Sequence, residues 1–255
     1  MKLHPAFILV ISMLAAGFAR GDTYSFKEPF TRTGSFSANG SVTLENINGD
    51  VDIRTWNKNE ILIEGEKSAA TEKELKAIDL SMDVSESHAA IKVRLPKRAG
   101  GWFSGNTIRA SVRFSITVPA TAILEKIATV NANVTVTSTR GATQVETVNG
   151  QIFARDIGGS ARLKTVNGEI KARFVSVPAG QEFRFTTVNG SIAVELPGDA
   201  GVSLHASTVN GHVDCDFPLT LAASSGRQSL RGTIGDARAT LEAGTVNGSI
   251  HIERR

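Results

Sequence analysis

The sequence predicts an all-β protein: a β-solenoid, or β-helix, of about seven short coils that follows an irregular N-terminal β region with one short helix. Three observations lead to this prediction. Asn-Gly recurs at near-regular intervals, apolar residues alternate after each copy, and the same residue types return at the same repeat positions. The six Asn-Gly pairs begin at Asn48, Asn149, Asn167, Asn189, Asn210 and Asn247.

The composition of the 255 residues is that of an ordinary folded protein, with 41% hydrophobic and 21% charged residues. This length is enough for a core that needs no disulfides or metals. The single cysteine, Cys215, excludes a disulfide framework and a cysteine-ligated zinc site. The formal charge of +3 is a small excess among 28 basic and 25 acidic side chains. We therefore expect no nucleic-acid partner.

Residues 1–19 have the pattern of a secretory signal peptide. Lys2 precedes an apolar stretch that ends in the small-x-small sequence Gly17-Phe18-Ala19, and we expect cleavage near Ala19. The fourteen residues between Pro5 and Arg20 are fewer than the roughly 20 that a membrane-spanning helix needs. The sequence therefore predicts an exported protein, periplasmic or at the cell surface, with no transmembrane segment after cleavage.

Residues 20–119 are predicted to form the irregular β region, which caps one end of the rod. Thr71 and Glu74 match a capping box, which predicts a short helix. No linker separates this region from residues 120–255, so we expect one continuous structure. Apolar patterning indicates strands within residues 42–53, 61–63, 90–95 and 108–118.

Residues 120–255 contain the regular repeat. The last five Asn-Gly glycines are 18, 22, 21 and 37 residues apart, and Thr129–Ala132 extends the series upstream without its glycine. The gap of 37 is divided if Leu230–Ile234 is a decayed copy, which gives seven units of 16 to 22 residues. Each unit holds two short strands and two turns. We expect the turn glycine, or the asparagine before it, to adopt a positive φ.

Side chains of a strand point alternately to its two faces, so parity identifies the residues that enter the core. After each Asn-Gly, apolar residues occupy every second position and polar residues lie between them. Cys215 falls in the same inward column as Ala154, Ala172 and Val194. We therefore expect Cys215 to be a small buried residue with an unreactive thiol.

Two folds fit strands joined by Asn-Gly: an antiparallel meander and a solenoid whose coils stack in register. Stacking in register rewards identical neighbours, whereas a meander places unlike positions side by side. The repeated Asn column therefore favours the solenoid, with a structural turn ladder of Asn149, Asn167, Asn189, Asn210 and Asn247.

Three segments together resemble the bacterial putative-adhesin family of exported β-repeat proteins: residues 46–51, the strand at residues 114–119, and the serial Thr-Val-Asn-Gly-Ser-Ile motifs. The resemblance runs from about Ser35 to Glu253 and implies a β-helical fold in the cell envelope. The family is described largely as domains of unknown function and has no catalytic motif to transfer. The departures are Ala132 in place of glycine and the decayed unit near Gly232.

The sequence predicts no catalytic, cofactor-binding or metal-binding residues. Asp214 and Asp216 share one strand face about 7 Å apart, a spacing equally typical of a solvated strand. His212, Asp214 and His251 are a possible metal-ligand set, but a decayed coil between the last two would separate them by about 10 Å, too far for one ion.

A glycine-rich loop at residues 96–106 is the candidate partner-binding site. Trp102 and Phe103 at its tip, with Lys97 and Arg98 nearby, suit either contact with a sugar, lipid or protein surface or a plug over one end of the rod; we favour the plug. We expect a non-enzymatic structural or adhesin-like binding protein whose partner is an envelope protein or glycan. The alternative is a carbohydrate-active β-helix enzyme, a polysaccharide lyase or hydrolase.

Overall fold

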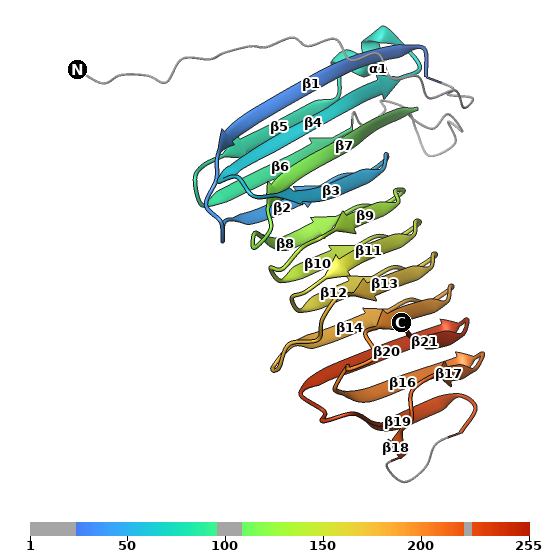
Figure 1. Ribbon diagram of the computed structural model, residues 1–255. Helices are drawn as coiled ribbons and strands as arrows, with labels where there is room; N and C mark the ends of the chain where they lie inside the picture. Colours follow the sequence, from blue (N-terminus) through green and yellow to red (C-terminus); the bar gives the residue numbers. More distant parts are fainter. Residues whose placement is uncertain (1–23, 96–108, 222–225) are drawn as a thin grey trace.

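The protein is an elongated, almost entirely β structure made of two facing sheets (Figure 1). The computed structural model describes residues 24–95, 109–221 and 226–255. The predicted signal peptide and the whole glycine-rich loop at residues 96–106 lie outside these residues. No helix in the described part of the chain is long and apolar enough to cross a membrane.

The first sheet has ten strands. In spatial order they are β1 (Phe26–Ser35), β4 (Glu60–Ala69), β7 (Ala110–Pro119), β3 (Val51–Trp56), β9 (Val134–Thr137), β11 (Ile152–Ile157), β13 (Ile170–Phe174), β15 (Ile192–Leu196), β21 (Ile250–Arg254) and β17 (Val213–Cys215). The strands from β3 to β17 pair in parallel, each with the equivalent strand of the neighbouring coil.

The second sheet has eleven strands. In spatial order they are β18 (Thr220–Leu221), β19 (Ser229–Ile234), β16 (Val202–Asn210), β20 (Ala239–Asn247), β14 (Glu182–Thr186), β12 (Ala161–Lys164), β10 (Thr143–Glu146), β8 (Ile123–Ala128), β2 (Ser41–Glu45), β6 (His88–Arg94) and β5 (Asp79–Val84). The core lies between the two sheets, and in the repeat strands β9 to β16, β20 and β21 the alternation of buried residues follows the predicted parity.

The repeat strands stack in parallel and in register, which confirms the solenoid-like stacking over the meander. Ile152 pairs with Ile170, which pairs with Ile192, which pairs with Ile250, and all four side chains are fully buried. An inner column of identical residues buries the same apolar area at every step, so each coil covers the inner face of the next.

The N-terminal strands extend both sheets beyond the parallel stack. β1, β4 and β7 pair antiparallel at the end of the first sheet, and β5 pairs antiparallel with β6 at the end of the second. The predicted helix is confirmed as α1 (Glu72–Lys76), where the Thr71 hydroxyl accepts a hydrogen bond from the Glu74 backbone N–H at 3.2 Å. That bond satisfies one of the helix's free amide donors.

The C-terminal coil lies between coils that precede it in the sequence. β20 and β21 pair with β14 and β15 on one side and with β16 and β17 on the other. The prediction that Leu230–Ile234 is a decayed coil is therefore wrong. This segment belongs to β19, which pairs antiparallel with β16 and β18 at the sheet edge.

Most corner glycines serve close approach rather than left-handed geometry. The predicted positive φ is confirmed at Gly49 and Gly248, where φ is 108° and 153°, and is wrong for Gly150, Gly168, Gly190 and Gly211. A Cβ added to Gly190 would lie 1.9 Å from the carbonyl oxygen of Gly168 in the adjacent coil. Stacked backbones therefore meet at this corner with no room for a side chain.

Cys215 is half-buried, so the prediction of full burial is wrong. Its inward direction is as expected, because Cys215 pairs in register with the buried Ile252. β17, however, is the last strand of its sheet, so among the described strands Cys215 has a neighbour in register on one side alone. Burial is the main cause that raises the pKa of the Cys215 thiol.

Candidate functional site

The Thr-Val-Asn-Gly corners form a continuous edge along the rod. The threonine is buried, and its hydroxyl donates to a corner carbonyl of the adjacent coil. The acceptor is Ala132 for Thr147 and a glycine in the other corners; Thr187 Oγ1 donates to Gly168 O at 3.0 Å. The asparagine amides form a ladder in which Asn149 Nδ2 donates to Asn131 Oδ1 at 2.8 Å. In spatial order the ladder consists of Asn48, Asn131, Asn149, Asn167, Asn189, Asn247 and Asn210.

Exposed valines accompany this ladder. The valine of each corner points outward, and five of these valines are among the most exposed large apolar residues of the described chain, at 38–58% exposure. Outward apolar residues in register make an apolar ridge beside the amides. The residues of the ridge are Val130, Val148, Val188, Val246 and Val209.

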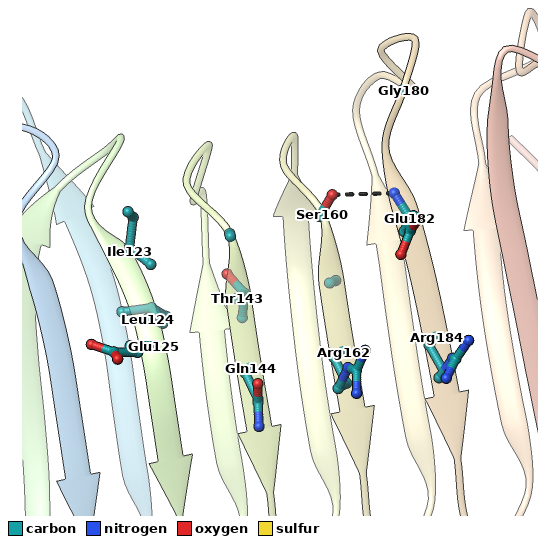
Figure 2. A pocket seen from close by; sticks show the side chains of 12 residues that line it. Ile123, Leu124, Glu125, Thr143, Gln144, Ser160, Arg162, Gly180, Glu182 and Arg184 are labelled. Carbon is teal, nitrogen blue, oxygen red and sulfur yellow. Dashed lines mark hydrogen bonds between the residues drawn. The ribbon is translucent and has the colours of Figure 1, made fainter.

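A groove with mixed polar and apolar lining crosses the outer face of the second sheet over β8, β10, β12 and β14 (Figure 2). Its volume is about 390 Å³. Ser160 lies at one side of the groove, where its hydroxyl accepts a hydrogen bond from the Glu182 backbone N–H at 3.1 Å. Glu182 also lines the groove, and its other charged or polar lining residues are Glu125, Thr143, Gln144, Arg162 and Arg184.

Arg162 and Arg184 are the cations of this groove, and Figure 2 shows them side by side on neighbouring strands. They are register partners on β12 and β14, so their backbones are about 4.8 Å apart. Arg184 forms an ion pair with Glu242 at 2.7 Å. Arg162 is exposed and has no ion pair or hydrogen bond with another described residue. The groove therefore holds one cation whose donors remain available.

The sequence did not single out this groove. Parity places both arginines on the outer face, and equal spacing from the Asn-Gly corners places them in one column, so the signal was present. The predicted partner-binding loop with Lys97, Arg98, Trp102 and Phe103 lies outside the described residues, and its role stays a prediction.

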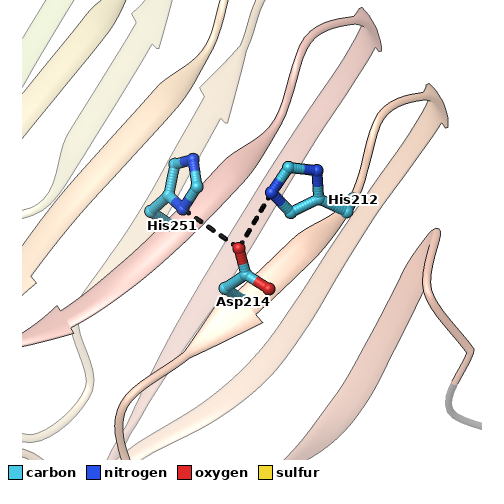
Figure 3. Close-up of side chains that lie close together, drawn as sticks. All are labelled: His212, Asp214 and His251. Atoms are coloured by element: carbon cyan, nitrogen blue, oxygen red, sulfur yellow. Dashed lines mark ion pairs between the residues drawn. The ribbon is translucent and has the colours of Figure 1, made fainter.

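His212, Asp214 and His251 lie together on the outer face of the first sheet (Figure 3). Asp214 Oδ2 is 3.0 Å from His212 Nε2 and 3.3 Å from His251 Nδ1. The predicted separation of about 10 Å is wrong, because no coil lies between β17 and β21. Asp214 and His251 are direct register partners.

Residues 125–253 match the Toastrack DUF4097 family. No match was found among curated proteins. Among solved structures, a "putative cell adhesion protein" from Clostridium sporogenes shares 15% identity at a TM-score of 0.46, over 89% of this chain and 100% of that chain. A "putative adhesin" from Bacteroides fragilis shares 12% identity at a TM-score of 0.30, over 88% and 97% of the two chains.

A "putative lipid binding protein" from Parabacteroides distasonis shares 13% identity at a TM-score of 0.30, over 88% of this chain and 96% of that chain. The family match is independent of these distant structures. It covers just over half of the 255 residues and includes every strand from β9 to β21. The serial Thr-Val-Asn-Gly corners and most of the parallel stack lie within this segment, and the chain belongs to the Toastrack DUF4097 family.

Proposed function

We propose that this protein is a non-enzymatic, exported, adhesin-like binding protein of the bacterial cell envelope. The observation that carries the binding role is the groove in which Arg162 stands exposed and unpaired beside Arg184. Export rests on the signal-peptide pattern of residues 1–19.

The groove lies on a rod that we infer to have seven coils. Each coil contributes one strand to each sheet, and the stack runs from β2 with β3 to β16 with β17. Neighbouring parallel strands are about 4.8 Å apart, so outward side chains recur at that interval along the rod. A regular row of side chains suits a ligand that is itself an extended repeating chain.

Within this charge-mixed groove, the unpaired guanidinium of Arg162 favours an acidic polysaccharide as the ligand. Guanidinium groups bind carboxylates and sulfates through two parallel hydrogen bonds, and Arg162 has its donors available. Gln144 is the register partner of Arg162 and offers amide groups for sugar hydroxyls. Ile123, 38% exposed, supplies an apolar surface at the other side of the groove.

Binding of polygalacturonate to the purified protein tests this proposal. We expect saturable binding that weakens with added salt, and no binding of neutral dextran. Arg162→Gln should weaken the binding at least about tenfold, since a charge-assisted hydrogen bond contributes roughly 1.5–3 kcal/mol. Arg155 is an exposed residue of β11 on the other sheet. Arg155→Gln removes the same charge there and should leave binding unchanged. Equal effects of the two variants would contradict a site in the groove.

The carbohydrate-active enzyme is the alternative function, and the same material distinguishes it. A lyase or hydrolase would release new chain ends from polygalacturonate during a long incubation, whereas a binding protein leaves the polymer length unchanged. Chain cleavage that Arg162→Gln abolishes would contradict the non-enzymatic role.

A further inference from the structure

We propose that His212, Asp214 and His251 form a binding site for a late first-row divalent metal ion, with Zn²⁺ the representative ion. This site lies on the outer face of the first sheet, whereas the groove of the proposed function lies on the second sheet. The two proposals therefore depend on different residues and can fail independently.

The backbone holds the three side chains on one face. Asp214 and His251 are register partners on parallel strands, and His212 precedes Asp214 by two residues, which gives both the same outward direction. One potential ligand atom from each residue lies within 4.8 Å of the other two. Figure 3 shows both imidazoles turned toward the Asp214 carboxylate.

These separations suit a shared ion. Ligands about 2.0–2.1 Å from a tetrahedral zinc are about 3.4 Å from one another. Asp214 Oδ2 lies 3.0 and 3.3 Å from the two histidine nitrogens, so small rotations of exposed side chains complete the arrangement. Two nitrogens and one carboxylate oxygen form a ligand set for zinc, copper or nickel rather than for calcium or magnesium.

A neighbouring side chain orients one of the histidines. His212 Nδ1 is 2.9 Å from Ser249 Oγ, in the adjacent coil. When Nδ1 carries the proton and donates it to this hydroxyl, the lone pair of Nε2 faces Asp214. Metal-bound histidines commonly have such a partner on the other ring nitrogen, and losing it typically costs 10–100-fold in metal affinity.

The approach to the site is open. The next residue in the column of His251 is Ala193, whose side chain is too short to reach over the ion. The three side chains are themselves partly exposed. Three protein ligands thus leave at least one coordination position for water or for a ligand group of a partner.

Calorimetric titration of the purified chain, free of any histidine tag, with ZnCl₂ tests the proposal. We expect one Zn²⁺ per chain and no saturable Ca²⁺ binding. His251→Ala and Asp214→Asn should each weaken Zn²⁺ binding at least about tenfold, and Ser249→Ala about tenfold. Affinity should fall as the pH is lowered, because imidazole binds a metal only when neutral.

The control is His205→Ala, which removes a histidine of β16 on the second sheet and should change Zn²⁺ affinity less than twofold. Circular dichroism establishes that each variant is folded. Cobalt substitution gives a second readout, since Co²⁺ bound by these groups should show a visible absorption band that His251→Ala removes. Zn²⁺ binding that is unchanged in a folded His212→Ala/His251→Ala double variant would overturn the proposal, as would the absence of stoichiometric binding by the unmodified chain.

Discussion

Asn247 donates its side-chain amide to Asn189 at 2.7 Å, although 58 residues separate them in the chain. On its other side, Asn247 Oδ1 accepts a hydrogen bond from Asn210 at 2.8 Å. The last Thr-Val-Asn-Gly of the sequence is therefore an interior member of the ladder, and Asn210 is its end. This order determines which residues become neighbours at the C-terminal end of the rod, including the three side chains of the proposed metal site.

Replacement of ladder asparagines should reveal this order. Asn189→Leu and Asn247→Leu each break two amide hydrogen bonds and should cost about 1–2 kcal/mol of unfolding free energy. Asn210→Leu breaks one and should cost about half as much. Urea denaturation of the three variants measures these costs. A loss at Asn247 as small as that at Asn210 would contradict an interior position for Asn247.

The corner glycines should not tolerate a methyl group. Gly190→Ala places a Cβ against the carbonyl oxygen of Gly168, and the coils must separate locally, at a cost of about 1–3 kcal/mol or more. Gly244→Ala is the matched control, because no heavy atom lies within 4 Å of its added Cβ. We expect its effect to stay within about 0.5 kcal/mol. Thermal melts compare the stabilities of the two variants. A Gly190→Ala variant that is as stable as the unmodified protein would contradict close approach at this corner.

The buried threonine hydroxyl should contribute measurably to stability. Thr187→Val keeps the shape but leaves the Gly168 carbonyl without its hydroxyl donor, and should cost about 1 kcal/mol. Thr186→Val changes the adjacent, exposed residue of β14 in the same way and should cost much less. Similar denaturant midpoints for the two variants would argue against a role for this hydrogen bond.

The Cys215 thiol should react slowly in the native protein. Burial, and to a lesser extent the negative charge of Asp216, raises its pKa, so the thiolate fraction at neutral pH is lower than for a free thiol. Labelling should accelerate about tenfold for each unit of rising pH while the thiol remains mostly protonated. The rate at which a maleimide reagent labels Cys215, measured with and without urea, checks this prediction. Native labelling as fast as that of the unfolded chain would contradict the half-buried position.

The sequence predicted the local structure well, because the signals for strands and for the helix lie within a few residues of one another. Side-chain parity predicted the buried faces, and the capping box at Thr71 predicted α1. The order of the coils was not predictable. Asn210 and Asn247 each stand in Thr-Val-Asn-Gly, so either could stack equally well on Asn189 by local criteria.

That ambiguity explains why the histidine cluster could not be predicted, whereas the arginine pair could. Arg162 and Arg184 are adjacent because their coils follow one another in the chain, and their equal spacing from the corners encodes this. His212 and His251 are adjacent only because β20 and β21 enter the stack beside β16 and β17. Between these coils in the chain, β19 pairs antiparallel with both β18 and β16. This reversal brings the chain back to the start of β20 beside β16.

Disulfide cross-linking tests the insertion of the C-terminal coil most directly. In a Cys215→Ser background, the double variant Ser191→Cys/Ser249→Cys joins the residues that directly precede the register partners Ile192 and Ile250. Neighbouring parallel strands are about 5 Å apart, within disulfide range. The control Ser191→Cys/His212→Cys joins positions that would be neighbours only if the coils stacked in sequence order. We predict rapid disulfide formation in the first variant and none in the second under mild oxidation. Cross-linking of Ser191→Cys/His212→Cys with none between positions 191 and 249 would contradict the coil order on which this account rests.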